Sequence, residues 1–198
     1  MSDFMGDAPS CPWSERETEL LAITLELLKE HGYDRLNVEA VATKAKASKA
    51  TLYRRWPSKA DLVLAAFIEG TRLEAVVPQT GSLREDLLII GSQVCEHAAE
   101  HAPTMRAVLN EIVRSPALTE AFRTGFIDQR HRMLMAVLRN AADRGEIDAE
   151  AINDEIWDVL PGYLVFRSLL PVTSPSAETV RTLVDEVMMP SLLRTRTD

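Results

Sequence analysis

Apolar residues recur at the spacing of an α-helix along most of the chain. In residues 38–45 they follow an i, i+3, i+4, i+7 pattern, which gathers them on one helical face. The same period, interrupted by Gly and Pro, predicts an all-α fold of about nine helices, the seventh of them interrupted near Gly125. The expected helices are 14–31, 38–45, 48–55, 59–76, 83–100, 103–114, 116–144, 149–170 and 176–193.

Side-chain caps mark where several of these helices begin. A Ser followed three residues later by an acidic residue, the capping-box pattern, occurs at Ser14, Ser58 and Ser82. Asn37 and Ser48 can cap the two short helices that follow the first one. The third helix is expected to end before Pro57, whose ring excludes the α conformation at the preceding residue.

The charge of the chain is unevenly distributed. The net charge is −8, yet the window from Arg35 to Lys59 holds seven basic residues and one acidic residue, Glu39. That window carries +6, so the rest of the chain carries −14. A basic island on an acidic protein is the pattern expected for phosphate binding. A solvated helix face is the alternative interpretation of such a basic run.

The basic island coincides with two short helices joined by a tight turn. This arrangement predicts a helix-turn-helix unit, in which the small apolar residues of the first short helix and Leu52 of the second face the core. Residues early in the second helix are expected at base edges, and Tyr53 and Lys59 at phosphates, whereas Arg54 and Arg55 can contact either. The candidate DNA contacts are Asn37, Lys46, Ser48, Lys49, Ala50, Thr51, Tyr53, Arg54, Arg55 and Lys59.

Residues 31–63 resemble the DNA-binding domain of the tetracycline-repressor-like (TetR) family. Their sequence is HGYDRLNVEAVATKAKASKATLYRRWPSKADLV. The matching features are His31-Gly32-Tyr33, Val38, Val41-Ala42, Ala45, Ser48, Thr51-Leu52-Tyr53, Trp56, Lys59 and Leu62. The resemblance implies a homeodomain-like three-helix domain, a homodimer and a C-terminal ligand pocket coupled to repression. It therefore predicts a repressor that a small hydrophobic ligand releases from a palindromic operator, although activation in place of repression stays open.

One position departs from the family pattern. The turn of the family usually reads Ala-Gly-Val, whereas this chain has Ala45-Lys46-Ala47. If Lys46 takes a positive φ, it costs on the order of 1 kcal/mol relative to Gly. A contact between Lys46 and a phosphate would offset part of that cost.

The chain is expected to comprise two domains. Residues 1–57 form the N-terminal tail and the helix-turn-helix domain, and residues 58–198 form a ligand-binding and dimerisation domain, with the fourth helix as the connector. Methionine and aromatic side chains in the second domain can line a site for a small, largely apolar molecule, although each of them can equally be core. The candidate ligand-binding residues are Met105, Phe122, Phe126, His131, Trp157, Tyr163, Phe166 and Arg167.

The last two helices are expected to form the dimer interface. In residues 176–193 the apolar positions Val180, Leu183, Val184, Val187 and Met188 form one stripe. Such a stripe either docks inward or pairs with its copy across a two-fold axis. A dimer would present two recognition helices to half-sites one or more DNA turns apart.

Other function classes find less support in the sequence. There is no Gly-rich phosphate loop, nucleophile elbow or HExxH motif, so we expect no catalytic residues and no cofactor. A helical adaptor that binds another protein is the remaining alternative. His97 and His101 are spaced i, i+4 and could face one metal ion, but packed or solvated histidines are more common, and we expect no metal.

Cysteine usage and the absence of targeting signals point to the cytoplasm. Cys11 and Cys95 show neither a disulfide framework nor zinc-ligand spacing. The acidic N-terminus lacks the apolar core of a signal peptide. No apolar stretch approaches the ~18 residues needed to cross a bilayer, so we expect no membrane partner.

Overall fold

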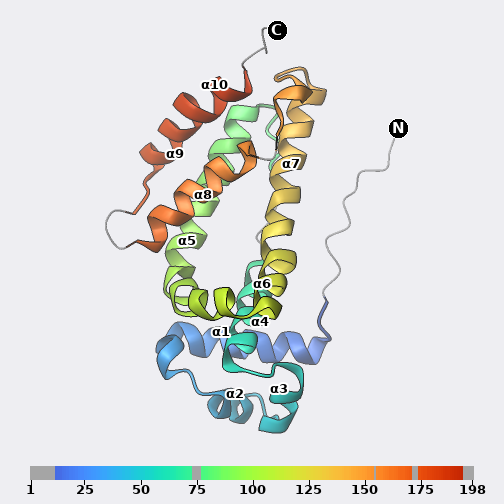
Figure 1. Ribbon diagram of the computed structural model, residues 1–198, viewed down its shortest axis with the longest axis vertical. Helices are drawn as coiled ribbons and strands as arrows, with labels where there is room; N and C mark the ends of the chain where they lie inside the picture. The colour runs from blue at the N-terminus through green and yellow to red at the C-terminus, as the bar shows by residue number, and fades with distance from the viewer. Residues whose placement is uncertain (1–11, 73–76, 154, 171–173, 194–198) are drawn as a thin grey trace. The chain divides into compact units, whose positions relative to one another are not determined.

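Every regular element in the described part of the chain is helical (Figure 1), which confirms the all-α prediction. The computed structural model describes residues 12–72, 77–153, 155–170 and 174–193. Their α-helices are α1 (Glu15–Arg35), α2 (Val38–Lys44), α3 (Lys49–Arg55), α4 (Lys59–Arg72), α5 (Leu83–Arg114), α6 (Pro116–Phe122), α7 (Asp128–Asp143), α8 (Ile156–Leu169), α9 (Ala177–Leu183) and α10 (Met189–Leu192). When segments joined by π-helical turns are counted together, these residues form eight helices, where about nine were expected.

The chain divides into two compact units between Gly70 and Thr71, in the last turn of α4. The domain boundary expected from the sequence, after residue 57, treats α4 as a connector and stays a prediction. The end of the expected fourth helix, residues 73–76, lies outside the described residues. None of the helices described is long and apolar enough to cross a membrane.

Helices of the first unit begin at the predicted caps. The Ser14 hydroxyl accepts from the Glu17 N–H, and the Glu17 carboxylate accepts from the Ser14 N–H at 2.8 Å, so the capping box of α1 is confirmed. Ser58 and Asp61 make the same reciprocal pair at the start of α4. Gly32 has φ 76°, so α1 kinks where its end was expected.

The core of the first unit is built from one face of each of its helices. α1 packs against α2, and α2 against α3. Because the apolar positions of each helix recur at helical spacing, they converge on this core. Its buried side chains include Leu20, Leu21, Leu28, Val41, Ala42, Ala45, Leu52 and Trp56.

In the second unit, α5 is one continuous helix from Leu83 to Arg114, so the predicted break between residues 100 and 103 is wrong. Pro103 lies inside it, where a proline removes a backbone hydrogen bond and costs about 3 kcal/mol or more. Buried residues on both sides of it, Ala102 and Val108, keep the helix against the core. Burial along 32 residues therefore outweighs one helix-breaking residue.

The interruption of the seventh helix expected near Gly125 is a wider helical turn, and the chain stays helical through it. Residues Arg123–Ile127 form a π-helical turn that joins α6 to α7. A second π-helical turn, Val184–Met188, joins α9 to α10.

The helix predicted at 149–170 begins later than expected. A single 3-10 turn occupies Ala149–Ala151, with Asp148 as its cap, and α8 starts at Ile156. The Asn153 side chain accepts from the N–H groups of Glu155 and Ile156, both at 3.0 Å. Short polar side chains that bind nearby backbone groups compete with helix formation, which explains the late start.

The apolar stripe of the last helix docks inward. Val180, Leu183, Val184 and Met188 are buried in the core that α5, α7 and α8 also form. Val187, the remaining member of the stripe, is 43% exposed. The stripe is therefore core in the protomer, and the expectation that it forms the contact with a second copy is wrong.

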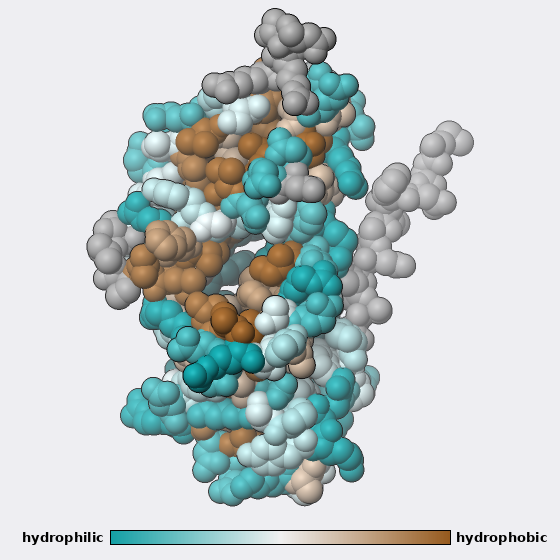
Figure 2. Space-filling model, viewed as in Figure 1, coloured by the Kyte–Doolittle hydropathy of each residue, from teal (hydrophilic) through white to brown (hydrophobic). Residues whose placement is uncertain are grey.

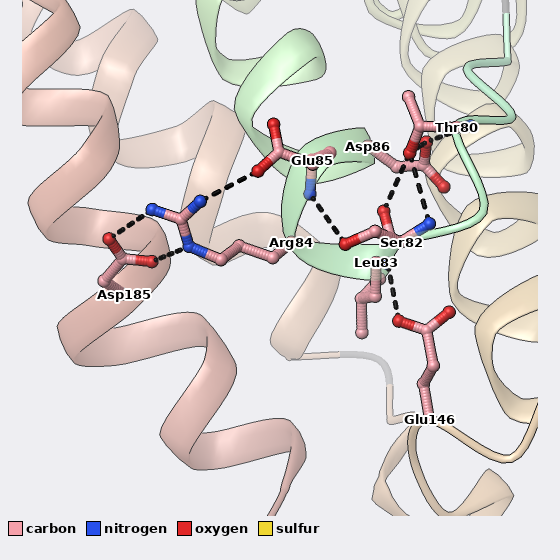
Figure 3. Close-up of polar contacts among 8 residues, drawn as sticks. All are labelled: Thr80, Ser82, Leu83, Arg84, Glu85, Asp86, Glu146 and Asp185. Carbon is pink, nitrogen blue, oxygen red and sulfur yellow. Dashed lines mark hydrogen bonds and ion pairs between the residues drawn. The ribbon is translucent and has the colours of Figure 1, made fainter.

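A polar cluster fixes the N-terminal end of α5 (Figure 3). Glu146 accepts from the Leu83 N–H at 2.7 Å, and this bond to the backbone is the largest cause of its lowered pKa. Arg84 makes a two-pronged ion pair with Asp185, with N···O distances of 2.7 and 2.8 Å. The cluster thus ties the start of α5 to the loop after α7 and to the last helix. Buried Asp86 accepts from the N–H and hydroxyl of Thr80.

Close packing of α5 on α9 makes Gly91 a sensitive position. A Cβ added there would overlap Cγ1 of Val180, which is buried. We expect Gly91→Ala to lower the free energy of unfolding by about 1–3 kcal/mol, the usual cost of overpacking. In a Val180→Ala background the same change should cost little, because Ala is a better helix former than Gly. Urea denaturation of the four proteins at one concentration measures this coupling, and equal costs in the two backgrounds would contradict it.

Candidate functional site

The turn between α2 and α3 is closed by a Schellman motif with Lys46 at its left-handed position. The Lys46 N–H donates to the Thr43 carbonyl at 3.1 Å, and the Ala47 N–H donates to the Ala42 carbonyl at 2.9 Å. Lys46 has φ 50°, which confirms the positive φ considered from the sequence. A non-glycine residue in this conformation costs on the order of 1 kcal/mol relative to Gly. After α7 the same motif uses Gly145, at φ 75°. The Lys46 side chain is exposed at the turn.

α3 presents one buried residue and a polar outer face. Ser48 caps it by accepting from the Thr51 N–H at 3.1 Å, and the two hydroxyls lie 2.8 Å apart. Leu52 is fully buried, as expected for the core side of a recognition helix. The exposed residues of α3 are Lys49, Ala50, Thr51, Tyr53, Arg54 and Arg55.

Lys49 is already paired within the first unit. Its Nζ lies 2.5 Å from Oε1 of Glu39 in α2 and 5.8 Å from the ring centroid of Tyr53. The hydrogen bond and charge of each partner raise the pKa of Lys49 and lower the pKa of Glu39. An exposed pair of this kind contributes little stability, so a competing anion can replace Glu39 as the partner of Lys49 at low cost.

Arg54 and Arg55 differ in what they contact. The structure records no ion pair or hydrogen bond between the exposed Arg54 side chain and any described residue. Arg55 donates through Nε to Oε1 of Glu17 at 2.5 Å, and its guanidinium lies 4.6 Å from the ring centroid of Trp13. The backbone bond from Ser14, then Arg55, holds the pKa of Glu17 below its usual value. Arg55 therefore links α3 to α1, whereas the Arg54 side chain extends from the exposed face of α3.

Lys59 and Asn37 also have structural partners. Lys59 Nζ donates to the Asp34 carbonyl at 3.3 Å and lies 4.5 Å from the ring centroid of Tyr33. This contact ties the start of α4 to the end of α1. Asn37 caps α2, its side chain accepting from the Glu39 N–H at 2.9 Å.

The second unit contains a pocket of about 50 Å³ where three helices converge. Its walls come from one face of α5, one face of α7 and the first turns of α8. Its lining residues are Ile90, Gln93, Val94, His97, Arg130, Met133, Leu134, Trp157 and Pro161.

Of the eight ligand-binding candidates, Trp157 lines this pocket. His131 stacks on Trp157 with ring centroids 4.4 Å apart, and its buried Nε2 has no hydrogen-bond partner among the described residues. Phe122 and Phe126 stack at 5.1 Å, and the Arg130 guanidinium lies 3.6 Å from the Phe126 ring centroid.

The other four candidates lie elsewhere in the second unit. Met105 is half-buried on α5, and Phe166 is exposed on α8. Arg167 donates to the hydroxyl of the exposed Tyr163 at 3.0 Å. None of these four is among the residues that line the pocket. Met105, Tyr163 and Phe166 were candidates because they are soft or aromatic, but residue type does not show which way a side chain faces.

Two residues of α7 hold the C-terminal end of α4. Gln129 Nε2 donates to the Arg72 carbonyl at 2.9 Å, and an Nη of Arg130 donates to the Thr71 carbonyl at 3.2 Å. Arg130 also lines the pocket. The pocket and the end of α4 therefore share the side chain of Arg130.

The described residues offer no group of three or more His, Cys, Asp or Glu side chains arranged to hold a metal ion. His97 faces the pocket, and His101 is buried on α5. Cys95 is a free thiol whose pKa is raised by burial, and Cys11 lies outside the described residues.

Both units are similar to known regulators. Residues 20–66 match the model "Bacterial regulatory proteins, tetR family", and residues 77–187 match "Tetracyclin repressor-like, C-terminal domain". An uncharacterised HTH-type transcriptional regulator of Mycobacterium tuberculosis is 60% identical over 183 residues, covering 92% of this chain and 91% of the relative. The DNA-binding transcriptional repressor TetR of Mycobacteroides abscessus is 33% identical, covering 88% and 92%. A crystal structure of a TetR family transcription regulator, 27% identical, aligns with TM-score 0.73 over 88% of this chain and 97% of that one.

Proposed function

Because the chain belongs to the TetR family of DNA-binding transcriptional regulators, we propose that it is a dimeric repressor whose ligand releases it from a palindromic operator. The observation that carries the proposal is the capped helix α3, which buries Leu52 and exposes a basic and polar face behind a tight turn. Since its target is DNA, the protein acts in the cytoplasm.

The positions along α3 suggest how the operator is read. Lys49, Ala50 and Thr51 lie in the first turn, which enters the major groove in helix-turn-helix complexes, so we assign them to base edges. Lys46 and Tyr53 flank that turn, and we assign them to phosphates together with Lys59. Asn37 and Ser48 place helix N-termini, whose N–H groups can approach phosphates.

A second copy of the chain is the partner we assign to the exposed face of α8. Tyr163, Phe166 and Leu170 are spaced i, i+3, i+7 and are 42%, 60% and 46% exposed. Figure 2 shows hydrophobic side chains gathered over the part of the second unit that carries α8. Apolar patches of this kind mark interaction sites, and a two-fold axis would bury the same patch on both copies. The similarity to TetR regulators, which typically act as dimers, favours this partner.

We assign the coupling between ligand and DNA to α4. Its first turn contacts the end of α1 through Lys59, and its last carbonyls are held by Gln129 and Arg130. A small, largely apolar ligand in the neighbouring pocket would shift α4 and change the spacing of the two recognition helices. Such coupling is typically worth about 1–3 kcal/mol, a change in operator affinity of about 5- to 150-fold.

The function can be tested with DNA from the region upstream of the gene. Fluorescence anisotropy should show specific binding to a palindromic fragment, and affinity should fall steeply with salt, with a slope of about −0.9 for each phosphate neutralised. Hydrophobic compounds that raise Tm should then be titrated into the complex. A salt-independent or sequence-independent affinity would contradict the DNA proposal, and compounds that raise Tm without releasing DNA would indicate a constitutive repressor.

A further inference from the structure

The helix α3 has few core contacts of its own. It comprises seven residues, Lys49–Arg55, of which Leu52 is buried. A helix this short is not stable in isolation, so contacts with neighbouring elements fix where it lies. Because base contacts require donors and acceptors at set distances, the orientation of α3 decides whether its outer face can recognise a sequence. Residues that fix this orientation can therefore contribute to recognition without touching DNA.

The first turn of α1 contacts the chain both before α3 and at its end. Before α3, the Arg16 guanidinium donates to the carbonyl of Ala45, the residue that ends α2 beside the turn. At the end of α3, Arg55 donates through Nε to Oε1 of Glu17 at 2.5 Å. Arg16 and Glu17 are neighbours in the sequence, so a single turn of α1 holds the segment before α3 and the last residue of α3.

Arg55 has two partners, a carboxylate and an indole ring. Its guanidinium lies 4.6 Å from the ring centroid of Trp13, within the range of a cation–π interaction. Trp13 in turn packs against Trp56, which is 4% exposed, with the ring centroids 5.9 Å apart. The Glu17 carboxylate also accepts from the Ser14 N–H, which fixes it in the cap of α1. Trp13, Glu17 and Arg55 therefore form one cluster that joins the start of α1 to the end of α3.

The Arg55–Glu17 pair is more enclosed than the Lys49–Glu39 pair at the other end of α3. The Glu17 side chain is 25% exposed, against 60% for Glu39. An anion that approaches Arg55 has to displace a carboxylate that is partly buried and held by its own helix cap. Separating a partly buried pair costs more than separating an exposed one, so Lys49 exchanges its partner more readily than Arg55.

We propose that Arg55 is a positioning residue and not a DNA ligand, and that Trp13 and Glu17 act with it to hold α3 at the angle that operator recognition requires. The inference rests on the DNA-binding function proposed above, and it adds two residues outside the helix-turn-helix to those that determine specificity. The Arg55 side chain is 49% exposed, so direct contact with a phosphate is the alternative that the test has to exclude.

Glu17→Gln separates positioning from simple electrostatics. Removing a negative charge near DNA would by itself raise affinity, whereas losing the pair with Arg55 should lower affinity for the palindromic upstream fragment by about tenfold. Affinity for a scrambled duplex of the same length should not fall, because non-specific binding depends on charge and not on the angle of α3. Unchanged or higher affinity of Glu17→Gln for the palindromic fragment would overturn the proposal.

Glu15→Gln is the matched control for this charge change. Glu15 is exposed in the same turn of α1, and the structure records no ion pair or hydrogen bond between it and α3. Glu15→Gln should leave specific affinity within about twofold of the wild type. A loss as large as that of Glu17→Gln would show a general effect of charge at the start of α1, and the proposal would fail.

Arg55→Gln tests whether Arg55 itself contacts DNA. If Arg55 acts through Glu17, specific affinity should fall about as far as in Glu17→Gln, and the salt slope should stay within about 0.5 of the wild-type value. The double variant should lose no more than either single variant, because each change removes the same pair. A slope flattened by about 1.8 for the dimer, or losses that multiply in the double variant, would show that Arg55 binds phosphate. Either result would overturn the proposal.

Two replacements of Trp13 test the role of its ring. Trp13→Phe keeps an aromatic face for the Arg55 guanidinium and should retain most of the specific affinity. Trp13→Ala should lose specific affinity about as far as Glu17→Gln, while binding to the scrambled duplex shows that the protein is folded. Wild-type specific affinity in Trp13→Ala would contradict the role assigned to Trp13.

Hydrogen exchange of the free protein distinguishes this inference from the function on which it rests. Glu17→Gln should speed exchange of the amides of residues 52–56 by at least about tenfold and leave the middle of α1 unchanged. If the wild type shows no specific DNA binding but this exchange responds, the proposed function fails and the positioning of α3 stands. If DNA is bound specifically and neither exchange nor affinity responds to Glu17→Gln, the function stands and the positioning fails.

Discussion

Replacing Phe166 with Glu is expected to convert the proposed dimer into monomers and to weaken operator binding by about 100-fold or more. Phe166 is 60% exposed in the protomer, so the substitution should change the stability of the isolated fold by less than about 0.5 kcal/mol. In a two-fold interface each new carboxylate would face an apolar patch and its own copy, which costs several kcal/mol. A monomer reaches one half-site only, and a loss of about 3 kcal/mol corresponds to about 150-fold in affinity.

Light scattering at micromolar concentration measures the change in mass, and anisotropy measures operator affinity. Val113→Glu is the control, because Val113 is 75% exposed on α5 and outside the proposed interface, so this variant should stay dimeric. Leu183→Glu is not a usable test, since Leu183 is 7% exposed and the charge would enter the core. A Phe166→Glu protein that remains a dimer would show that the copies meet elsewhere.

Two substitutions, one in the recognition helix α3 and one in the neighbouring α2, should change DNA affinity in opposite directions. Arg54→Ala removes an exposed cation from each protomer, so the dimer should lose about 5- to 150-fold in affinity. If Arg54 contacts phosphates, the salt slope should also flatten by about 1.8. Glu39→Gln removes the carboxylate that pairs with Lys49, so affinity should rise several-fold.

Anisotropy titrations over a range of salt concentrations measure both changes. Lys29→Ala alters the charge by the same amount as Arg54→Ala, but Lys29 is exposed on α1 outside the helix-turn-helix, so its effect should be small. The assignment of the DNA-binding face would be contradicted if Arg54→Ala and Lys29→Ala weakened binding equally. A fall in affinity for Glu39→Gln would show that the Lys49–Glu39 pair positions α3 for binding.

Local signals allowed most helix starts to be predicted from the sequence. The caps at Ser14, Asn37, Ser48, Ser58 and Ser82 all accept from the expected first-turn N–H groups. These predictions succeeded because a cap depends on residues within four positions of each other. The positive φ of Lys46 was equally local, since the tight turn leaves few other conformations.

Predictions that depended on distant contacts were less successful. The break at Pro103 was wrong because residues on both sides of it are buried and α8, far along the chain, packs against α5, which a local rule cannot register. The stripe of the last helix was apolar as described, but whether it faces its own core or a second copy depends on how α5 and α8 pack against it. Of the residues that line the pocket, the spacing at Ile90, Gln93, Val94 and His97 was the missed signal, because it places two polar groups on an apolar face.

Both ends of α4 are anchored, so under the proposed coupling this helix would act as a rigid arm. Its 14 residues span about 21 Å, with Lys59 held near the end of α1 and the Thr71 and Arg72 carbonyls held by α7. Moving the far end by about 1 Å while the near end stays fixed would rotate the helix by about 3°. In a two-fold dimer, opposite rotations of two such arms would add at the half-sites, whose spacing of about 34 Å leaves little tolerance. Under the proposed coupling, a ligand would need to displace only the few atoms that hold the last carbonyls of α4, so a small pocket would suffice for control.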